Sequence, residues 1–189
     1  MRRLKLQVQT TADGYMGGPN GEMDWLTWSW SADLNDYSDK LHESVDCIVL
    51  GRKLAEGFIP SWQARREDPQ GESEETIEFM NNTPKVVISN SLSESPWESA
   101  VVAGGNLTEV ITELKDQPGD DIIAYGGSEF VSSLVADSLI DDYHLFVNPA
   151  AIGAGLPIFP KAQIQLDLVG AKQFECGIAV LHYRPKSAG

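Results

Sequence analysis

Three residues suited to phosphate binding follow a short apolar run in the second half of the chain. The run Ile122 to Tyr125 has the composition of a buried strand, and Gly126, Gly127 and Ser128 come directly after it. The first turn of a helix offers unpaired backbone N–H groups and the positive end of the helix dipole. Glycine has no Cβ atom, so a phosphate can approach such a backbone closely. This order of residues predicts a site for nucleotide phosphates; the simpler alternative is a tight turn with Ser128 as an N-cap.

Two other apolar runs also end in residues that could hold a nucleotide. They are Gly51, Arg52 and Lys53 after the run 47–50, and Ser89 and Asn90 at the end of the run 85–90. Arginine makes forked contacts to phosphate, lysine adds a point charge, and hydroxyl and amide groups suit a ribose or an additional phosphate. The alternatives are solvated charges in a strand-to-helix turn and ordinary turn chemistry for serine and asparagine.

A glycine-rich segment over residues 13–21 precedes three tryptophans, Trp25, Trp28 and Trp30. The segment is either a flap over a substrate or an irregular connection. Indole faces can stack on a flat ring, although such residues more often pack in a core or a dimer interface. Asp33 lies close by and is a candidate proton relay. Its alternative role is electrostatic, because aspartate is favoured near the start of a helix.

The elements that must position these residues alternate along the chain. Strands are expected at 4–10, 47–50, 85–90, 100–102, 121–125, 142–148, 163–172 and 177–184, and helices at 31–45, from 54 to 58, 76–81, 107–115 and 128–136. Residues 61–75 are polar and are expected to be mobile. This order predicts a single α/β domain over residues 1–189, with a mostly parallel central sheet and an antiparallel C-terminal pair. Ligands of such sheets bind at the carboxyl ends of the strands, where all three candidate motifs lie.

Composition and charge exclude several classes of protein. The formal charge of −14 argues against a nucleic-acid surface and against binding to anionic membranes. No apolar run approaches the roughly 18 residues of a spanning helix, and the N-terminus does not resemble a signal peptide. Cys47 and Cys176 are expected to be buried thiols, and the histidines have no metal-ligand spacing. A cytoplasmic protein is the expectation.

Taken together, these segments resemble the dihydrofolate reductase-like superfamily. The most similar branch is the stand-alone relatives of the C-terminal reductase domain of the bifunctional riboflavin biosynthesis protein. The segments that carry the resemblance are 11–18, 48–53, 87–90, 124–128, 141–145 and 153–159. The resemblance implies a three-layer α/β/α sandwich with a mixed, mostly parallel sheet. It also implies an NADPH-dependent reductase that forms homodimers and acts on a small molecule such as a pterin or 5-amino-6-(5-phosphoribosylamino)uracil.

The resemblance also implies roles for individual residues. The cofactor's phosphates would contact Gly51, Arg52, Lys53, Gly126, Gly127, Ser128 and Glu129, its adenosine side Ser89 and Asn90, and its nicotinamide the backbone near Ala12, Gly17 and Gly18. Beyond the resemblance, we expect Tyr15, Trp25 and Tyr125 to shape the substrate pocket and Asp33 to relay protons. The chain departs from the family at Tyr15, Leu54 and Tyr125, and its 189 residues contain no zinc-binding His/Cys motif of the deaminase half. These departures leave a second hypothesis, a non-enzymatic dimeric ligand-binding protein that keeps the fold.

Overall fold

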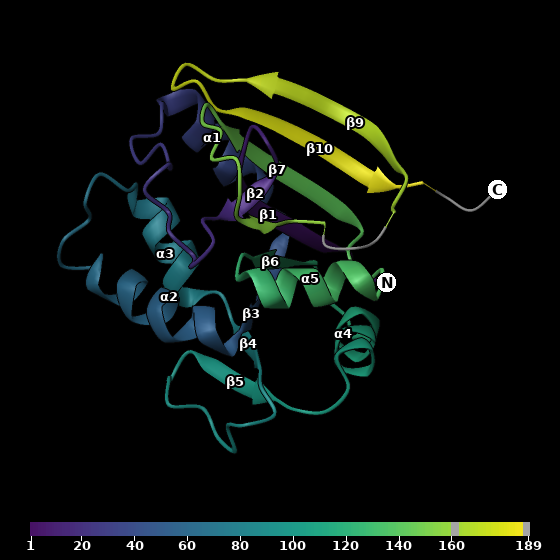
Figure 1. Ribbon diagram of the computed structural model, residues 1–189. Helices are drawn as coiled ribbons and strands as arrows, with labels where there is room; N and C mark the ends of the chain where they lie inside the picture. The colour runs from purple at the N-terminus through teal and green to yellow at the C-terminus, as the bar shows by residue number, and fades with distance from the viewer. Residues whose placement is uncertain (160–162, 187–189) are drawn as a thin grey trace.

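Eight strands form the central sheet of the computed structural model, which describes residues 1–159 and 163–186 (Figure 1). Across the sheet they lie in the order β5 (Ala100–Ala103), β4 (Lys85–Ile88), β3 (Val45–Gly51), β6 (Asp121–Tyr125), β1 (Leu4–Thr11), β7 (Asp142–Asn148), β10 (Ala179–Pro185) and β9 (Leu166–Gln173). The strands from β5 to β7 run parallel. Strand β10 is antiparallel to both β7 and β9, as predicted for the C-terminal pair.

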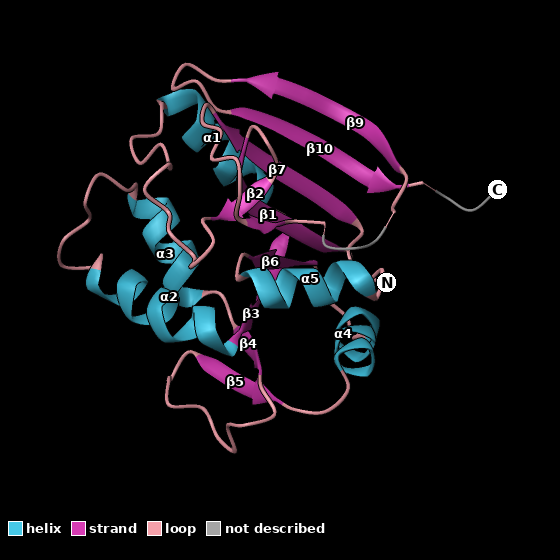
Figure 2. Cartoon of the chain, in the orientation of Figure 1, coloured by secondary structure: helices cyan, strands magenta, loops and turns pink. Residues whose placement is uncertain are grey.

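Helices cover both faces of this sheet (Figure 2). One face carries α4 (Leu107–Asp116) and α5 (Ser128–Ala136), and the other carries α1 (Ala32–His42), α2 (Arg52–Ala64) and α3 (Glu74–Asn82). Separate apolar clusters fill the two interfaces, one including Ile111 and Leu134, the other including Ile59 and Met80. The predicted three-layer α/β/α sandwich with a mixed, mostly parallel sheet is therefore confirmed.

The central strand β1 has an apolar side and a polar side. Leu4, Leu6 and Val8 belong to the cluster beneath α4 and α5. Because side chains alternate along a strand, Lys5 and Gln7 face the opposite layer. Both are nevertheless buried, because helices cover that face too. The structure thus encloses polar side chains beneath α1 and α2.

Two helix boundaries differ from those predicted. The first helix ends at His42 rather than Val45, because Val45 is buried in β3 and pairs with Asp121. Helix α2 continues through Pro60 to Ala64 and includes part of the segment expected to be mobile. Proline removes one helical N–H, but Ile59 is fully buried on this helix. Burial of its apolar side therefore outweighs the lost hydrogen bond.

The glycine-rich segment contains a strand that was not predicted. Strand β2 (Tyr15–Gly17) pairs antiparallel with β8 (Leu156–Pro157). A Cβ atom on Gly155 would lie 2.2 Å from the Gly17 carbonyl oxygen, so this approach requires glycine. The Asp13 carboxylate accepts hydrogen bonds from the backbone of Ile152 and Gly153. The glycine-rich connection is therefore ordered by strand pairing and by hydrogen bonds to a loop that is distant in sequence.

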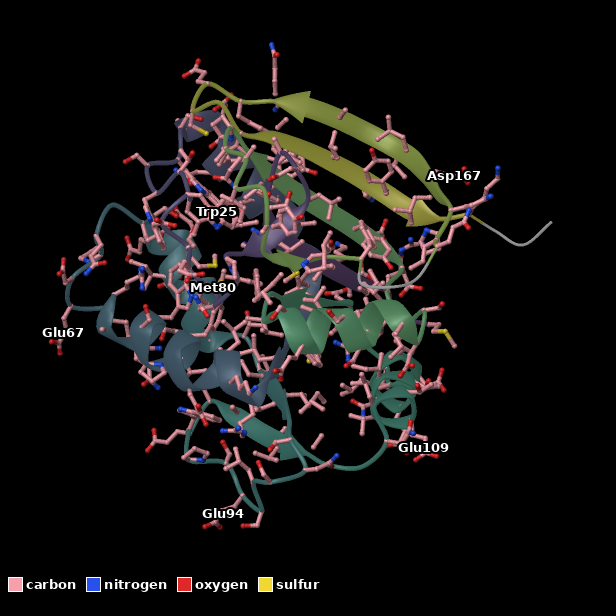
Figure 3. All side chains as sticks on the ribbon, in the orientation of Figure 1. Trp25, Glu67, Met80, Glu94, Glu109 and Asp167 are labelled. Carbon is pink, nitrogen blue, oxygen red and sulfur yellow. The ribbon has the colours of Figure 1, made fainter. Side chains whose placement is uncertain are left out.

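Acidic side chains lie at the periphery of the molecule. Figure 3 shows Glu67, Glu94, Glu109 and Asp167 at outer positions, and all four are exposed.

Across residues 1–159 and 163–186, no helix has the length and apolar character needed to cross a membrane.

The cysteines only partly match the prediction of two buried thiols. Both are free, and Cys47 is buried in β3. Cys176 is only half-buried, because it lies in the turn between β9 and β10, where its backbone N–H donates to Ser31 Oγ.

Candidate functional site

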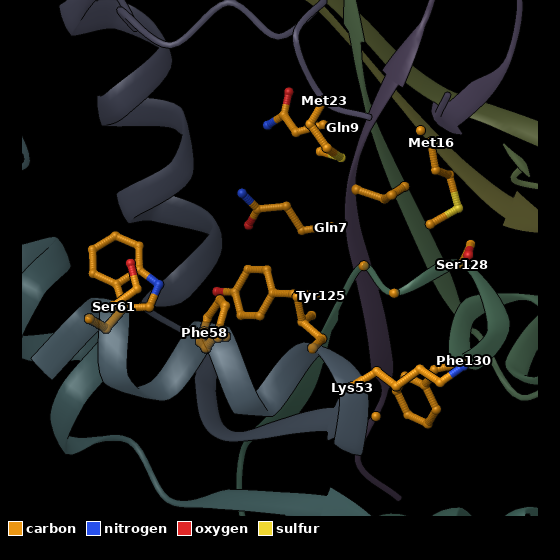
Figure 4. A pocket seen from close by; sticks show the side chains of 18 of the residues that line it. Gln7, Gln9, Met16, Met23, Lys53, Phe58, Ser61, Tyr125, Ser128 and Phe130 are labelled. Atoms are coloured by element: carbon orange, nitrogen blue, oxygen red, sulfur yellow. The ribbon is translucent and has the colours of Figure 1, made fainter. Parts of the chain in front are cut away.

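An open cavity of about 1420 Å³ lies at the carboxyl ends of neighbouring strands (Figure 4). Gly51 ends β3, Ser89 follows β4, and Gly126 follows β6; all three line the cavity. These strands are adjacent in the order β4-β3-β6. The three motifs therefore meet at one edge of the sheet, as their sequence context predicts. Their role in binding a cofactor stays a prediction.

Two helices begin at this cavity. Helix α2 starts directly after Gly51, and α5 starts directly after Gly127, which has a φ of 98°. Within the part of the chain that the structure describes, neither helix has a side-chain N-cap, whereas Ser73 caps α3 and Asn106 caps α4. Uncapped N–H groups with a helix dipole behind them attract anions. The cavity edge is thus suited to hold phosphate groups.

Gly51 allows the two helix starts to come together. A Cβ atom at this position would lie 2.8 Å from Cβ of Phe130 in the first turn of α5. The neighbour is close to the backbone and cannot move without shifting the helix. Gly127 lies on the other side of this contact, and a Cβ there would be 3.5 Å from Leu54 Cβ. Close packing of the helix starts therefore depends on glycine at the end of β3.

The two basic residues at the start of α2, Arg52 and Lys53, are both paired with carboxylates. Lys53 Nζ lies 2.9 and 2.8 Å from the two carboxylate oxygens of Glu129, and this pair connects α2 with α5. Arg52 contacts Glu56 one turn further along α2. The hydrogen bond from Lys53 lowers the pKa of Glu129, which therefore stays ionised. An arriving phosphate would meet a lysine whose charge is partly offset by this carboxylate.

Ser89 and Asn90 perform turn chemistry at the cavity wall. Ser89 Oγ accepts hydrogen bonds from the backbone N–H groups of Ser91 and Leu92, each at 3.2 Å. Asn90 Oδ1 accepts from the Gly105 backbone at 2.6 Å. These bonds are the turn interactions proposed as the alternative role, and both residues also line the cavity.

Of the predicted loop residues, Gly17 lines the cavity, as do Trp28 and Trp30. Trp28 is 74% exposed at the rim, while Trp30 stacks on Phe146 with ring centroids 5.5 Å apart. Five predicted residues lie outside the cavity lining formed by the described chain: Ala12, Tyr15, Gly18, Trp25 and Asp33.

Hydrogen bonds and strand pairing, several of them with segments distant in sequence, hold these five residues in place. Ala12 donates its backbone N–H to Ala150, and Gly18 donates to Glu22. Tyr15 lies in β2 opposite Pro157. The indole N–H of Trp25 donates to the Glu22 carbonyl at 3.1 Å.

Asp33 lies in the first turn of α1, where it accepts hydrogen bonds from Ser31 Oγ and from the Glu175 backbone. The Ser31 hydroxyl is the main cause of its lowered pKa. These contacts match the electrostatic alternative at a helix start.

The floor of the cavity holds polar groups that the sequence reasoning did not select. Tyr125, predicted for the pocket, is joined there by Gln7 and Gln9 from β1. Tyr125 Oη lies 2.9 Å from His42 Nε2, and its ring stacks on Phe58. The signal for Gln7 was present, because a polar residue in a central strand covered on both faces must be buried.

Burial shifts the pKa of both members of the Tyr125–His42 pair. It raises the pKa of Tyr125 well above 10, so the hydroxyl keeps its proton. Desolvation, with a smaller contribution from Lys5, lowers the pKa of His42 to about 4. Both side chains are therefore neutral near pH 7. The cavity combines an edge suited to phosphate with an uncharged floor suited to a polar ring.

The chain is similar in sequence to a protein family and to a bacterial protein. A family model described as the RibD C-terminal domain matches residues 2–180. The uncharacterized protein YyaP of Bacillus subtilis (strain 168) is 30% identical over 187 residues, which cover 96% of this chain and 94% of that protein.

Solved structures share the fold. A Shewanella sp. PV-4 protein assigned to riboflavin biosynthesis superimposes with a TM-score of 0.74 at 21% identity, covering 99% of this chain and 100% of that one. The diaminohydroxyphosphoribosylaminopyrimidine deaminase/5-amino-6-(5-phosphoribosylamino)uracil reductase of Thermotoga maritima gives a TM-score of 0.68 at 16% identity. That match covers 98% of this chain and 57% of the Thermotoga chain.

Proposed function

The chain belongs to the RibD C-terminal domain family, and we propose that it is an NADPH-dependent reductase of a small heterocyclic substrate. The substrate would be similar to a pterin or to 5-amino-6-(5-phosphoribosylamino)uracil, the compound in the name of the Thermotoga protein. The observation that carries the proposal is the pair of uncapped helix starts beside the turn Gly126-Gly127, all at one cavity. When bound, the cofactor would supply a hydride.

The residues at the strand ends fit such a cofactor. Backbone N–H groups at the starts of α2 and α5 would hold the pyrophosphate, because each start is open and has a helix dipole behind it. Arg52 and Lys53 would favour a 2′-phosphate. Ser89 and Asn90 line the cavity beyond β4, where the adenosine side would lie.

The protein's contribution to catalysis would be positioning. The sheet floor and the aromatic side chains Phe58 and Trp30 would hold a flat substrate against the nicotinamide and exclude water from it. Asp33 is not part of this proposal, because it lies outside the lining and its carboxylate is bonded to Ser31 and Glu175.

A turnover screen tests the proposed function. Pterins, aminouracils and quinones would each be incubated with the protein and NADPH, and cofactor oxidation followed by loss of its near-ultraviolet absorbance. We expect oxidation with at least one pterin or aminouracil, with product formation confirmed by mass spectrometry. Binding of NADPH without turnover on any compound would instead favour the non-enzymatic ligand-binding alternative.

A further inference from the structure

Two uncharged polar side chains, Gln7 and Tyr125, lie side by side on the floor of the cavity, and the fold leaves a polar atom of Gln7 unpaired. Gln7 of β1 pairs in register with Tyr125 of the parallel neighbour β6. Residues in register on adjacent strands point to the same face and lie about 4.8 Å apart. Figure 4 shows both side chains extending to the same side of the strands, with Phe58 beside the Tyr125 ring. They therefore present their polar ends to one part of the cavity.

The side-chain oxygen of Gln7 has no hydrogen-bond partner in the described chain. Its side chain lines the cavity and the residue is only 7% exposed. Its carboxamide oxygen is buried, and no donor lies within reach among the described residues. Buried polar atoms are nearly always paired, so an orphaned one on a side chain that lines a cavity calls for a ligand. A carboxamide offers an acceptor beside a donor, which matches the adjacent N–H and C=O of a lactam.

The partner of Tyr125 indicates where the hydroxyl hydrogen points. His42 Nε2 lies 2.9 Å from Tyr125 Oη, while His42 Nδ1 is buried without a partner in the described chain. If Nδ1 carried the hydrogen, an N–H donor would be buried and unpaired, which is the rarer kind of orphan. Placing the hydrogen on Nε2 makes His42 the donor to Tyr125 Oη. The tyrosine O–H is then free to donate to a ligand.

The surroundings of this pair favour a neutral ligand. Every strand residue that lines the cavity in the described chain is uncharged, and Ser38 and Thr76 add hydroxyl groups from α1 and α3. The charged lining residues, Arg52, Lys53, Arg65, Glu72 and Glu129, come from helices and from the segment after α2. Lys5 lies on the same face as Gln7 but is paired with Asp121 and Ser44.

We propose that Gln7 and Tyr125 form a recognition site for the lactam edge of an uncharged ring, and that His42 is a positioning residue that orients the Tyr125 hydroxyl. The site deepens the proposed function, on which it rests, by naming the side chains that choose the substrate. The Gln7 carboxamide oxygen accepts a hydrogen bond from the ring N–H, and the Gln7 carboxamide N–H donates one to the adjacent ring carbonyl. The Tyr125 hydroxyl donates to a second acceptor on the ring. Since the tyrosine keeps its proton, its part is to bind and align the ring.

Binding of lumazine, an uncharged fluorescent ring with lactam edges, tests this site in the presence of saturating NADPH. We expect Gln7→Leu and Tyr125→Phe each to raise the lumazine Kd about tenfold or more, while the NADPH Kd stays within about twofold. His42→Gln, which keeps an N–H donor, should retain more affinity than His42→Phe. Gln173→Leu and Tyr183→Phe, which make the same changes outside the cavity lining, are the matched controls.

A second measurement addresses the role of His42 directly. Nitrogen-15 NMR of the histidine rings should show His42 as the Nε2–H tautomer in the parent protein, and the ring signal should move in Tyr125→Phe. An Nδ1–H tautomer would overturn the positioning role. Lumazine binding that is unchanged in Gln7→Leu and Tyr125→Phe would overturn the site. The site would also be overturned if the parent protein bound NADPH but did not bind lumazine at about 1 mM. A parent protein that binds no NADPH would count against the proposed function instead.

Discussion

Lys53 and Glu129 face each other across the entrance of the cavity, and their pairing sets the charge that a phosphate would meet. Both side chains are largely exposed, so the pair itself adds little to stability. The carboxylate of Glu129 lies at the start of α5, where a bound anion is expected. Its charge therefore opposes that of the ligand, and Lys53 offsets it.

Removing the charge of Glu129 and removing the charge of Lys53 should change the affinity for NADPH in opposite directions. Glu129→Gln removes the repulsion and frees Lys53, so we expect NADPH binding to tighten about two- to fivefold at low salt. Lys53→Gln should weaken it by a similar factor, with less effect on NADH. Fluorescence titration measures both, and Glu109→Gln on α4 serves as the control. The same change in Kd for the two variants would contradict the assignment.

Buried neutral histidines should make the fold sensitive to mild acid. The pKa of His42 is lowered to about 4 and that of His144 to about 3, in both cases mainly by desolvation. Both are near 6.5 in the unfolded chain, so the unfolded state takes up protons first as the pH falls below 6.5. The free energy of unfolding is therefore highest above pH 6.5 and decreases as the pH falls toward 4.

Between pH 7 and pH 5, each histidine should lower the free energy of unfolding by about 2 kcal/mol. Urea unfolding at the two pH values measures the loss. The variant His42→Gln should show roughly half of it, since only His144 then contributes. A parent protein equally stable at both pH values would show that these rings accept protons in the fold.

At the scale of elements, the meeting of β3 and α5 determines whether the two helix starts can share one ligand. Gly51→Ala places a methyl group 2.8 Å from Phe130 Cβ, so α5 must shift. We expect a loss of about 1–3 kcal/mol of stability from overpacking and a weaker NADPH complex. Calorimetric melting and NADPH titration check both effects. Gly57→Ala in α2, where a Cβ meets nothing within 4 Å, is the matched control for the stability measurement and should be neutral or stabilising.

The elements that the sequence predicted well are those with strong local signals. The bounds predicted for β6, α5 and β7 agree with the structure, because each contains apolar residues in a clear pattern and has a glycine, serine or aspartate at its boundary. The three cavity motifs were found for the same reason.

Features made by distant contacts were missed. Strand β2 forms only because residues near 156 lie beside it, and α2 passes through Pro60 because Ile59 is buried. Gln7 lies on the polar side of β1, and its burial depends on helices placed later in the chain. Tyr15, Trp25 and Asp33 lie outside the cavity lining formed by the described chain. Tyr15 is paired with Pro157, Trp25 is bonded to Glu22, and Asp33 is bonded to Ser31 and Glu175.

At the scale of the whole molecule, the expected homodimer stays a prediction with a structural basis. Strand β9 is one of the two edges of the main sheet, and it exposes Leu168 (58%) and Val169 (47%). An exposed edge strand with apolar side chains favours association with another chain. Sedimentation should give a mass of twice 20.7 kDa, that is 41.4 kDa. A monomer at micromolar concentrations would contradict the expectation.

The central claim is that the cavity at the carboxyl ends of β3, β4 and β6 binds NADPH. Parallel fluorescence titrations with NADPH and NADH test it most directly, because they require no knowledge of the substrate. We predict saturable binding of NADPH well below about 1 mM and weaker binding of NADH. No binding of NADPH in that range would contradict the claim, and equal binding of the two cofactors would contradict the 2′-phosphate role of Arg52 and Lys53.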